Sequence, residues 1–287
     1  MIALLLLAAS TTSSFPQNSA VVEVCLSPGC LADGASSTLS KLKALSHPSV
    51  CVKSGTCQSL CGKGPILIQN PDGDGSKKRG HKVLLKFMKD DKKLLPFLEG
   101  LMEENANTNA IIDTELDERD LNRIPDALIE GYNLVDEGMN LCKQKSYKEA
   151  SQILKAGIDK AIQPAKSFGG DMEWMVHAHR SLAESLMGMA QAQPQTQNPN
   201  SEESDSSNYD RAMESLETAL NLNPEDESSC ALLAELHQAR NDPDSEYRAL
   251  VTMFALPDID SPNPPREVEN WRRSLGFRLQ ELQRERE

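Results

Sequence analysis

The sequence has few aromatic residues, no apolar stretch long enough to cross a membrane, and no recognisable catalytic constellation. Aromatic side chains make up 4% of the 287 residues. The apolar run at residues 2–9 is far shorter than the ~20 residues that a transmembrane helix needs. The chain also lacks a Gly-rich phosphate loop, a nucleophile beside a base, and a C-x-x-C redox pair. These absences argue against hydrolase, transferase and disulfide-exchange chemistry, and we expect no membrane span in the mature chain.

A shortage of basic residues limits the choice of partners. The chain has 30 Lys and Arg against 43 Asp and Glu, which gives a formal net charge of −13. Binding to nucleic acid requires a basic face, so nucleic acid is excluded as the main partner. Basic residues do concentrate at residues 77–93. This stretch is either a docking face for an acidic redox partner or a solvated Lys-rich edge that discourages strand pairing.

The amino terminus has the composition of a targeting segment. The apolar run at residues 2–9 is followed by small and hydroxyl residues, as at a secretory cleavage site. Phe15 within SSFP is similar to the Phe-centred cleavage motif of bipartite plastid presequences. We therefore expect residues 1–17 to be a targeting segment and the destination to be a plastid, with the secretory pathway or the mitochondrion as alternatives.

The seven cysteines are distributed unevenly. Four of them form two tight pairs, Cys25/Cys30 (C-x4-C) and Cys57/Cys61 (C-x3-C), and each pair follows a short β-like run. Two loops of this kind can each offer two thiolates to one centre, as a metal or cluster site requires. Cys51 lies between two valines in a strand-like segment, where we expect a buried small apolar residue.

Spacing alone leaves three interpretations of these four cysteines open. They could hold an iron–sulfur cluster, because thiolates are the usual cluster ligands. They could bind Zn²⁺ tetrahedrally, because four-thiolate zinc sites use similar gaps. If the chain is exported, they could form two local disulfides.

Residues 18–104 are expected to form one α+β domain. Apolar periodicity and turn residues predict the element order β-α-β-β-β-α. Gly29 is expected to give the first cysteine loop a flexible turn. The predicted strands are residues 21–25, 50–53, 66–69 and 81–86, and the predicted helices are residues 35–45 and 93–102.

This order, with cysteines after the first and second strands, resembles the thioredoxin-like [2Fe-2S] ferredoxins and the small iron–sulfur subunit of respiratory complex I. The resemblance covers about residues 20–104. Its motifs are VEVCLSPGC, the strand VCV before GTCQSLC, and GKGPILIQNPDG. The resemblance implies a thioredoxin-like fold and a [2Fe-2S] cofactor. Its implied ligands are Cys25, Cys30, Cys57 and Cys61.

A cluster held by four thiolates would make the domain a one-electron carrier without a substrate of its own. The cluster becomes more negative on reduction, so backbone N–H groups that point at its sulfurs favour the reduced form. Glycines in the cysteine loops allow the backbone to approach that closely. They are Gly29, Gly55, Gly62 and Gly64.

Residues 105–124 are polar and acidic and are expected to form a linker. The region 125–257 has helical periodicity without strand signals. Gly138, Ala150 and Gly157 are spaced twelve and seven residues apart, with large apolar residues between them. This small–large interlock of two antiparallel helices resembles a tetratricopeptide repeat (TPR), whose arrays usually hold a peptide or another subunit.

Two further helical pairs are expected. One combines residues 172–190 with a helix in which Ala212, Ala219 and Pro224 keep the repeat spacing, and its insertion, 191–208, is expected to be disordered. The other is degenerate, at residues 228–239 and 244–256. A charged capping helix is expected at residues 264–287. Its predicted apolar stripe is Val268, Trp271, Leu275 and Leu279.

Two histidines and two cysteines in the helical region could be mistaken for metal ligands or reactive thiols. His177 and His179 lie two apart on different helical faces, which places them poorly as paired metal ligands. Cys142 and Cys230 occupy apolar helix positions and are expected to be buried thiols.

Together these observations predict an α+β thioredoxin-like domain followed by an all-α TPR-like array. The expected function is [2Fe-2S] electron transfer, with the array docking the carrier on a redox partner or complex. One alternative is a scaffold or assembly factor whose cluster is structural, sensory or lost. Another is an iron–sulfur subunit of a larger oxidoreductase.

Overall fold

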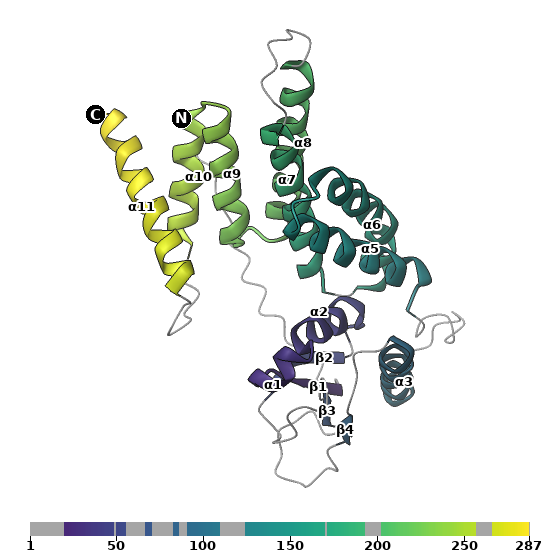
Figure 1. Cartoon of the computed structure of the whole chain (residues 1–287). Helices are drawn as coiled ribbons and strands as arrows, with labels where there is room; N and C mark the ends of the chain where they lie inside the picture. The colour runs from purple at the N-terminus through teal and green to yellow at the C-terminus, as the bar shows by residue number, and fades with distance from the viewer. Residues whose placement is uncertain are drawn as a thin grey trace. The chain divides into compact units, whose positions relative to one another are not determined.

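The computed structural model describes most of the chain and divides it into two compact units (Figure 1). The first unit contains Met1–Ile124 and Phe168–Asp171, and the second contains Pro125–Ser167 and Met172–Glu287. The predicted targeting segment, residues 1–17, lies outside the described residues. The described residues are 20–48, 50–55, 67–70, 83–85, 91–109, 124–169, 171–192, 202–256 and 266–286.

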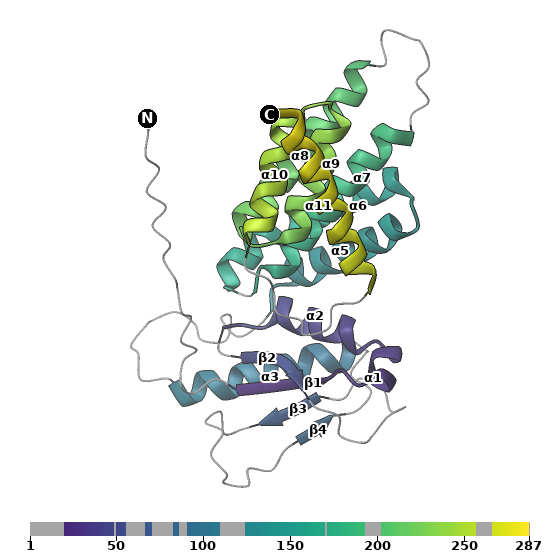
Figure 2. The same ribbon diagram turned by 90° about the vertical axis from the view of Figure 1, so that its left-hand side faces the viewer.

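The first unit contains a four-stranded mixed sheet with the strand order β2-β1-β3-β4. Strands β1 (Ala20–Cys25) and β2 (Val50–Gly55) run parallel. Strand β3 (Leu67–Asn70) is antiparallel to β1, and β4 (Val83–Leu85) is antiparallel to β3. Figure 2 shows the four strands side by side. The four strands predicted from sequence are therefore confirmed.

The helices of this unit are α1 (Pro28–Ala32), α2 (Ala35–Leu45) and α3 (Asp91–Asn109). Helix α2 contacts β1 and β2, and it provides the connection between these two parallel strands. Strand β1 buries Val22 and Val24 on one side, and α2 buries Leu42 and Leu45. Apolar residues at period two in the strand and at helical spacing in α2 thus build the core of this unit.

Two expectations for this unit are corrected. Gly29 does not form a flexible turn but lies inside α1, because Pro28 at the first helical position presets a helical φ angle. Residues 105–109, which were predicted to be linker, are helical because α3 continues to Asn109. Residues 110–123 lie outside the described residues, and Ile124, the last residue of the predicted linker, is fully buried.

The second unit is helical throughout its described part. Its helices form successive antiparallel neighbours, and α7 with α8 and α9 with α10 are in extensive contact. The mostly helical chain is thus compatible with a helical array. The helices are α5 (Asp126–Lys143), α6 (Tyr147–Phe168), α7 (Glu173–Ala192), α8 (Glu202–Leu222), α9 (Glu227–Ala239), α10 (Pro243–Ala255) and α11 (Arg266–Arg286).

Glycines allow α5 and α6 to pack closely. A Cβ atom placed on Gly138 would lie 2.6 Å from Cγ of Leu154, and one on Gly157 would lie 2.8 Å from the carbonyl oxygen of Gly131. These glycines therefore occupy positions where a neighbouring helix leaves no room for a side chain. The small–large interlock predicted between the two helices is confirmed at Gly138 and Leu154.

The insertion predicted at residues 191–208 is shorter at both ends than expected. Helix α7 continues to Ala192, and α8 begins at Glu202. Asn208 is buried, and Tyr209 packs against the apolar cluster formed by α7, α8 and α9. Polar composition predicted disorder across the whole tract, but packing of its last residues requires the helix to start earlier.

Helix α11 packs on α9 and α10 with its apolar side toward them. Trp271, Leu275 and Leu279 all pack against buried residues of these helices. The stripe differs from the expected one at both ends, because Val268 is exposed and Leu282 is fully buried. Within the described ranges, no helix is long and apolar enough to cross a membrane.

Candidate functional site

Cys25 ends strand β1 and is almost fully buried, with 1% of its surface exposed. Its Sγ lies 3.4 Å from Oγ of Ser27, and the thiol donates to that hydroxyl. If Cys25 loses its proton, the Ser27 hydroxyl can instead donate to the thiolate. The first predicted ligand therefore has a polar neighbour two residues away, in a site that excludes water.

Cys30 lies in the short helix α1 and is also 1% exposed. Ser27 precedes this helix as its N-cap, and the N–H of Leu31 donates to the Ser27 carbonyl at 2.9 Å. The segment between the two cysteines thus folds into a helical turn that begins at the end of β1. It brings both thiols of the first pair into the interior of the first unit.

The second cysteine pair, Cys57 and Cys61, lies outside the described residues, as do Gly62 and Gly64. The described chain before this pair ends at Gly55, the last residue of β2, which lies opposite Cys25 in the parallel ladder. A Cβ atom at Gly55 would lie 2.8 Å from Cβ of Glu23. Glycine at this position therefore keeps the two strand ends close together.

Two of the four predicted ligands can thus be placed, Cys25 and Cys30. No group of three or more His, Cys, Asp or Glu side chains within the described ranges could hold a metal ion. A complete four-cysteine centre would need Cys57 and Cys61 in addition. The basic stretch, residues 77–93, is described only at residues 83–85 and 91–93.

The remaining described cysteines are free thiols in three different surroundings. Cys142 and Cys230 are buried, as predicted, and burial raises the pKa of both thiols. Cys51 is only partly buried, so the expectation of a buried residue is corrected. The reason is the strand order, since β2 lies at the edge of the sheet.

A small pocket of about 200 Å³ lies in the second unit between α6, α7 and α8. His179 and Ser215 are both buried polar residues of its wall, and Nδ1 of His179 lies 3.3 Å from Oγ of Ser215. Nε2 of His179 has no hydrogen-bond partner within the described part of the chain. Burial lowers the pKa of His179, and the nearby Asp159 carboxylate opposes that shift.

His177 faces a different neighbour, Arg180, whose Nη2 lies 2.9 Å from its Nδ1. His177 and His179 therefore do not act together, in agreement with their spacing. The pocket beside His179 was not predicted from the sequence, because the residues of its wall are separated by up to about 60 residues along the chain. Its charged lining residues are Lys155, Asp159, Arg211 and Glu214.

Comparisons of this chain with protein families, with curated proteins and with solved structures give no match.

Proposed function

We propose that the chain is a [2Fe-2S] one-electron carrier whose helical unit docks it on a partner protein or complex. The observation that carries this proposal is the parallel pairing of Cys25 with Gly55 at the carboxyl ends of β1 and β2. One cysteine pair begins at Cys25, and the other begins two residues after Gly55 in the sequence. Both pairs thus leave the sheet from adjacent strand ends, as a shared centre requires.

The described donor set fits such a cluster. Cys25 and Cys30 are soft sulfur ligands in a buried setting, and Cys57 and Cys61 would complete the four-thiolate set. When bound, a [2Fe-2S] cluster accepts one electron and returns it without making or breaking a bond in the protein. The chain would orient its thiolates and exclude water from them. With Cys25 deprotonated as a ligand, the Ser27 hydroxyl, 3.4 Å from its Sγ, would donate to it and favour the more negative, reduced state.

The arrangement of the sheet supports the thioredoxin-like part of the proposal. β1 and β2 are parallel neighbours joined through α2, and β3 and β4 follow as an antiparallel pair. Helix α3 comes after the last strand, as in the order β-α-β-β-β-α that the ferredoxin resemblance implies. In the same way, close packing at Gly138 and Gly157 supports a TPR-like origin of α5 and α6.

The targeting segment predicted at residues 1–17 favours delivery of this carrier to a plastid, where the docking partner would be a redox protein or complex. The helical array would select the docking partner, and the sheet domain would carry the electron. In this proposal the protein has no substrate of its own and is not an enzyme.

Single cysteine substitutions test the proposal. Cys25→Ser and Cys57→Ser should each reduce the iron and acid-labile sulfide that the anaerobically prepared protein retains, because each removes one ligand. Cys51→Ser is the matched control, since Cys51 is a free thiol in the same unit and is not in either pair. Equal iron and sulfide in all three variants and the unmodified chain would contradict the assignment of these ligands.

A scaffold function is the second candidate, and it is favoured by the large, well-packed helical unit with its charged pocket beside His179. The same cysteine substitutions distinguish the scaffold function from the electron-carrier function. If Cys57→Ser abolishes electron transfer and leaves partner binding intact, the carrier is supported. If the substitution changes neither electron transfer nor partner binding, the function resides in the helical unit and does not require the cluster. Stable isolation with flavin-containing subunits would instead indicate a subunit of a larger oxidoreductase.

A further inference from the structure

Helix α11 presents two unlike sides. Its inner side is packed against the rest of the helical unit, because Leu275, Leu279 and Leu282 contact α9 and α10. Arg278 and Arg286 of α11 also form ion pairs with Glu246 and Asp244 of α10. The opposite side carries exposed residues at spacings of four, four, three and four, which place them along one face of the helix. We call this row the outer stripe; it consists of Glu269, Arg273, Phe277, Gln280 and Arg284.

The outer stripe is unusual for an exposed helix face. Such a face is normally polar or charged, because it is in contact with water. Here Phe277 stands at the centre of the stripe and is 60% exposed. Phe254 on the neighbouring helix α10 is 42% exposed. Large apolar side chains grouped around one exposed hollow indicate a surface that a partner covers.

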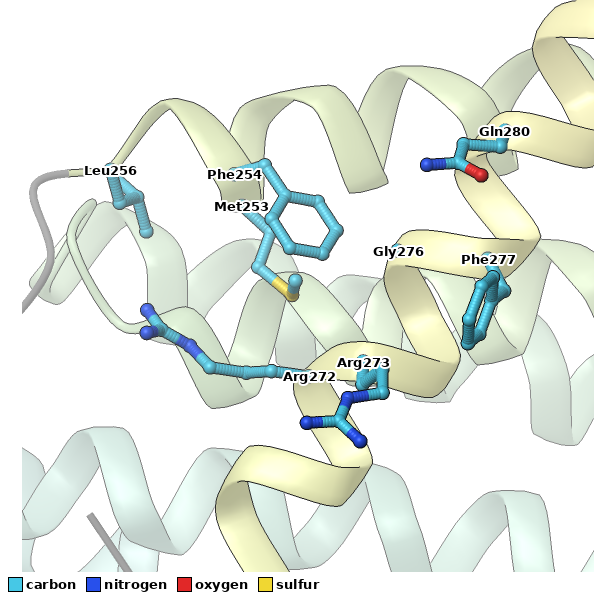
Figure 3. A pocket seen from close by; sticks show the side chains of 8 residues that line it. All are labelled: Met253, Phe254, Leu256, Arg272, Arg273, Gly276, Phe277 and Gln280. Atoms are coloured by element: carbon cyan, nitrogen blue, oxygen red, sulfur yellow. The ribbon is translucent and has the colours of Figure 1, made fainter. Parts of the chain in front are cut away.

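A hollow lies next to Phe277. A cavity of about 390 Å³ opens between α10 and α11, with Met253 and Phe254 on one side and Gly276 on the other (Figure 3). Gly276 adds no side chain to the wall of the hollow, and a Cβ atom there would be in ordinary van der Waals contact with Cζ of Phe254, at 3.7 Å. A projecting ring and a recess are thus adjacent on the same helix.

We propose that the outer stripe binds the outer stripe of a second copy of this chain, with the two α11 helices antiparallel. A twofold axis between Gly276 and Phe277 places each Phe277 opposite Gly276 of the other copy. Each ring then enters the hollow of the other copy. Such a self-complementary contact is what twofold symmetry requires, since each copy contributes both the ring and the recess.

The charges of the outer stripe agree with this pairing. In the antiparallel arrangement Glu269 faces Arg284 of the second copy, and Arg273 faces Gln280. No facing pair therefore combines two like charges, and the Glu269–Arg284 pair forms twice. Because each chain carries a formal net charge of −13, the copies repel one another at long range. Physiological salt, with a Debye length of about 8 Å, screens that repulsion and leaves close pairs effective.

The test is the oligomeric state of the full chain, measured by sedimentation equilibrium over a wide range of concentrations at physiological salt. We expect a concentration-dependent dimer, because one helix-to-helix contact is a small interface. Phe277→Ser should shift the chain to monomer. Val268→Ser is the matched control, since Val268 is an exposed apolar residue of α11 outside the outer stripe, and the dimer should persist.

Charge reversal tests the antiparallel register. Glu269→Arg and Arg284→Glu should each weaken the dimer by about tenfold, because two pairs become repulsive at once. The double variant, Glu269→Arg with Arg284→Glu, should restore it, and circular dichroism should show unchanged helix content in all variants. A chain that stays monomeric at every concentration, or a double variant that is no better than the singles, would overturn the proposal. Binding of a different protein by a monomeric chain would overturn it too.

Discussion

Cys25 and Gly55 face each other as the last residues of two parallel strands, β1 and β2. Two consequences follow from this one relationship. Cys25, the first buried thiol of its pair, lies beside the end of β2. The second cysteine pair begins two residues after that strand end in the sequence. An electron carrier gains from this arrangement, because a rigid sheet holds its ligands in one geometry through both oxidation states.

Substitution of Gly157 by alanine should destabilise the helical unit. The new Cβ atom would lie 2.8 Å from the carbonyl oxygen of Gly131 and 2.9 Å from the backbone nitrogen of Val135. Backbone atoms cannot move aside as a flexible side chain can, so we expect a loss of about 1–3 kcal/mol in the free energy of unfolding. Urea denaturation followed by circular dichroism measures it.

The control for this prediction is Gly100→Ala in α3, where a Cβ atom meets nothing within 4 Å. Alanine is the better helix former, so this change should raise stability by up to about 1 kcal/mol. If Gly157→Ala behaves like Gly100→Ala, then α5 and α6 do not pack as closely as described.

Acidification should weaken the helical unit through His179. Burial lowers the pKa of this histidine below its ordinary value of 6.5, so the fold favours the neutral ring. The unfolded chain takes up a proton first as the pH falls. The contribution of His179 is therefore complete above pH 6.5 and is lost as the pH falls through 6.5 toward the pKa of the folded state. Each unit by which the pKa is lowered corresponds to about 1.4 kcal/mol.

The measurement compares the unmodified chain with His179→Gln over a series of pH values. Burial also lowers the pKa of His237, but this residue is unchanged in both proteins and its effect cancels. The stability difference between the two proteins should shift in favour of His179→Gln as the pH falls from about 8 to about 5.5. A difference that does not change with pH would show that His179 titrates alike in the folded and unfolded chain.

Removal of Arg278 should destabilise the attachment of α11. Its Nε and Nη2 lie 2.8 Å and 3.0 Å from the two carboxylate oxygens of Glu246, and the Glu246 side chain is 4% exposed. Arg278→Met would leave that carboxylate buried without a partner. Because Arg278 itself is partly exposed, we expect a loss of about 2–3 kcal/mol, below the full cost of breaking a buried pair.

A surface ion pair with a similar N···O distance but a single contact provides the control. Arg240 Nη1 lies 2.8 Å from Asp210 Oδ1, but their side chains are 37% and 61% exposed. Arg240→Met should therefore cost less than about 1 kcal/mol. Adding Glu246→Gln to Arg278→Met should recover much of the lost stability, because it removes the buried charge. Equal losses for Arg278→Met and Arg240→Met would contradict the role given to burial.

The sequence was informative where one residue type dominates local conformation. Alternating Val22 and Val24 predicted β1, and the glycines of α5 and α6 predicted which positions lie between packed helices. Element ends were harder to predict. Pro96 and Pro164 lie within helices α3 and α6, so proline did not mark their ends, and α3 extends to Asn109.

Other features depend on contacts between distant segments, which local patterns do not contain. The partial exposure of Cys51 follows from the position of β2 at the sheet edge. The pocket beside His179 requires three helices to meet. Likewise, the position of α11 on α9 and α10 decides that Val268 is exposed and Leu282 is buried. None of these could be predicted from spacing within one helix or strand.

The central claim, a [2Fe-2S] centre at the edge where Cys25 faces Gly55, is tested most directly by spectroscopy. The full chain would be purified without oxygen, and its visible spectrum would be recorded before and after reduction with dithionite, together with the electron paramagnetic resonance spectrum of the reduced sample. We predict visible absorption that bleaches on reduction and a reduced-state signal of a [2Fe-2S] centre. A colourless protein that stays colourless after anaerobic reconstitution with iron and sulfide would contradict the claim.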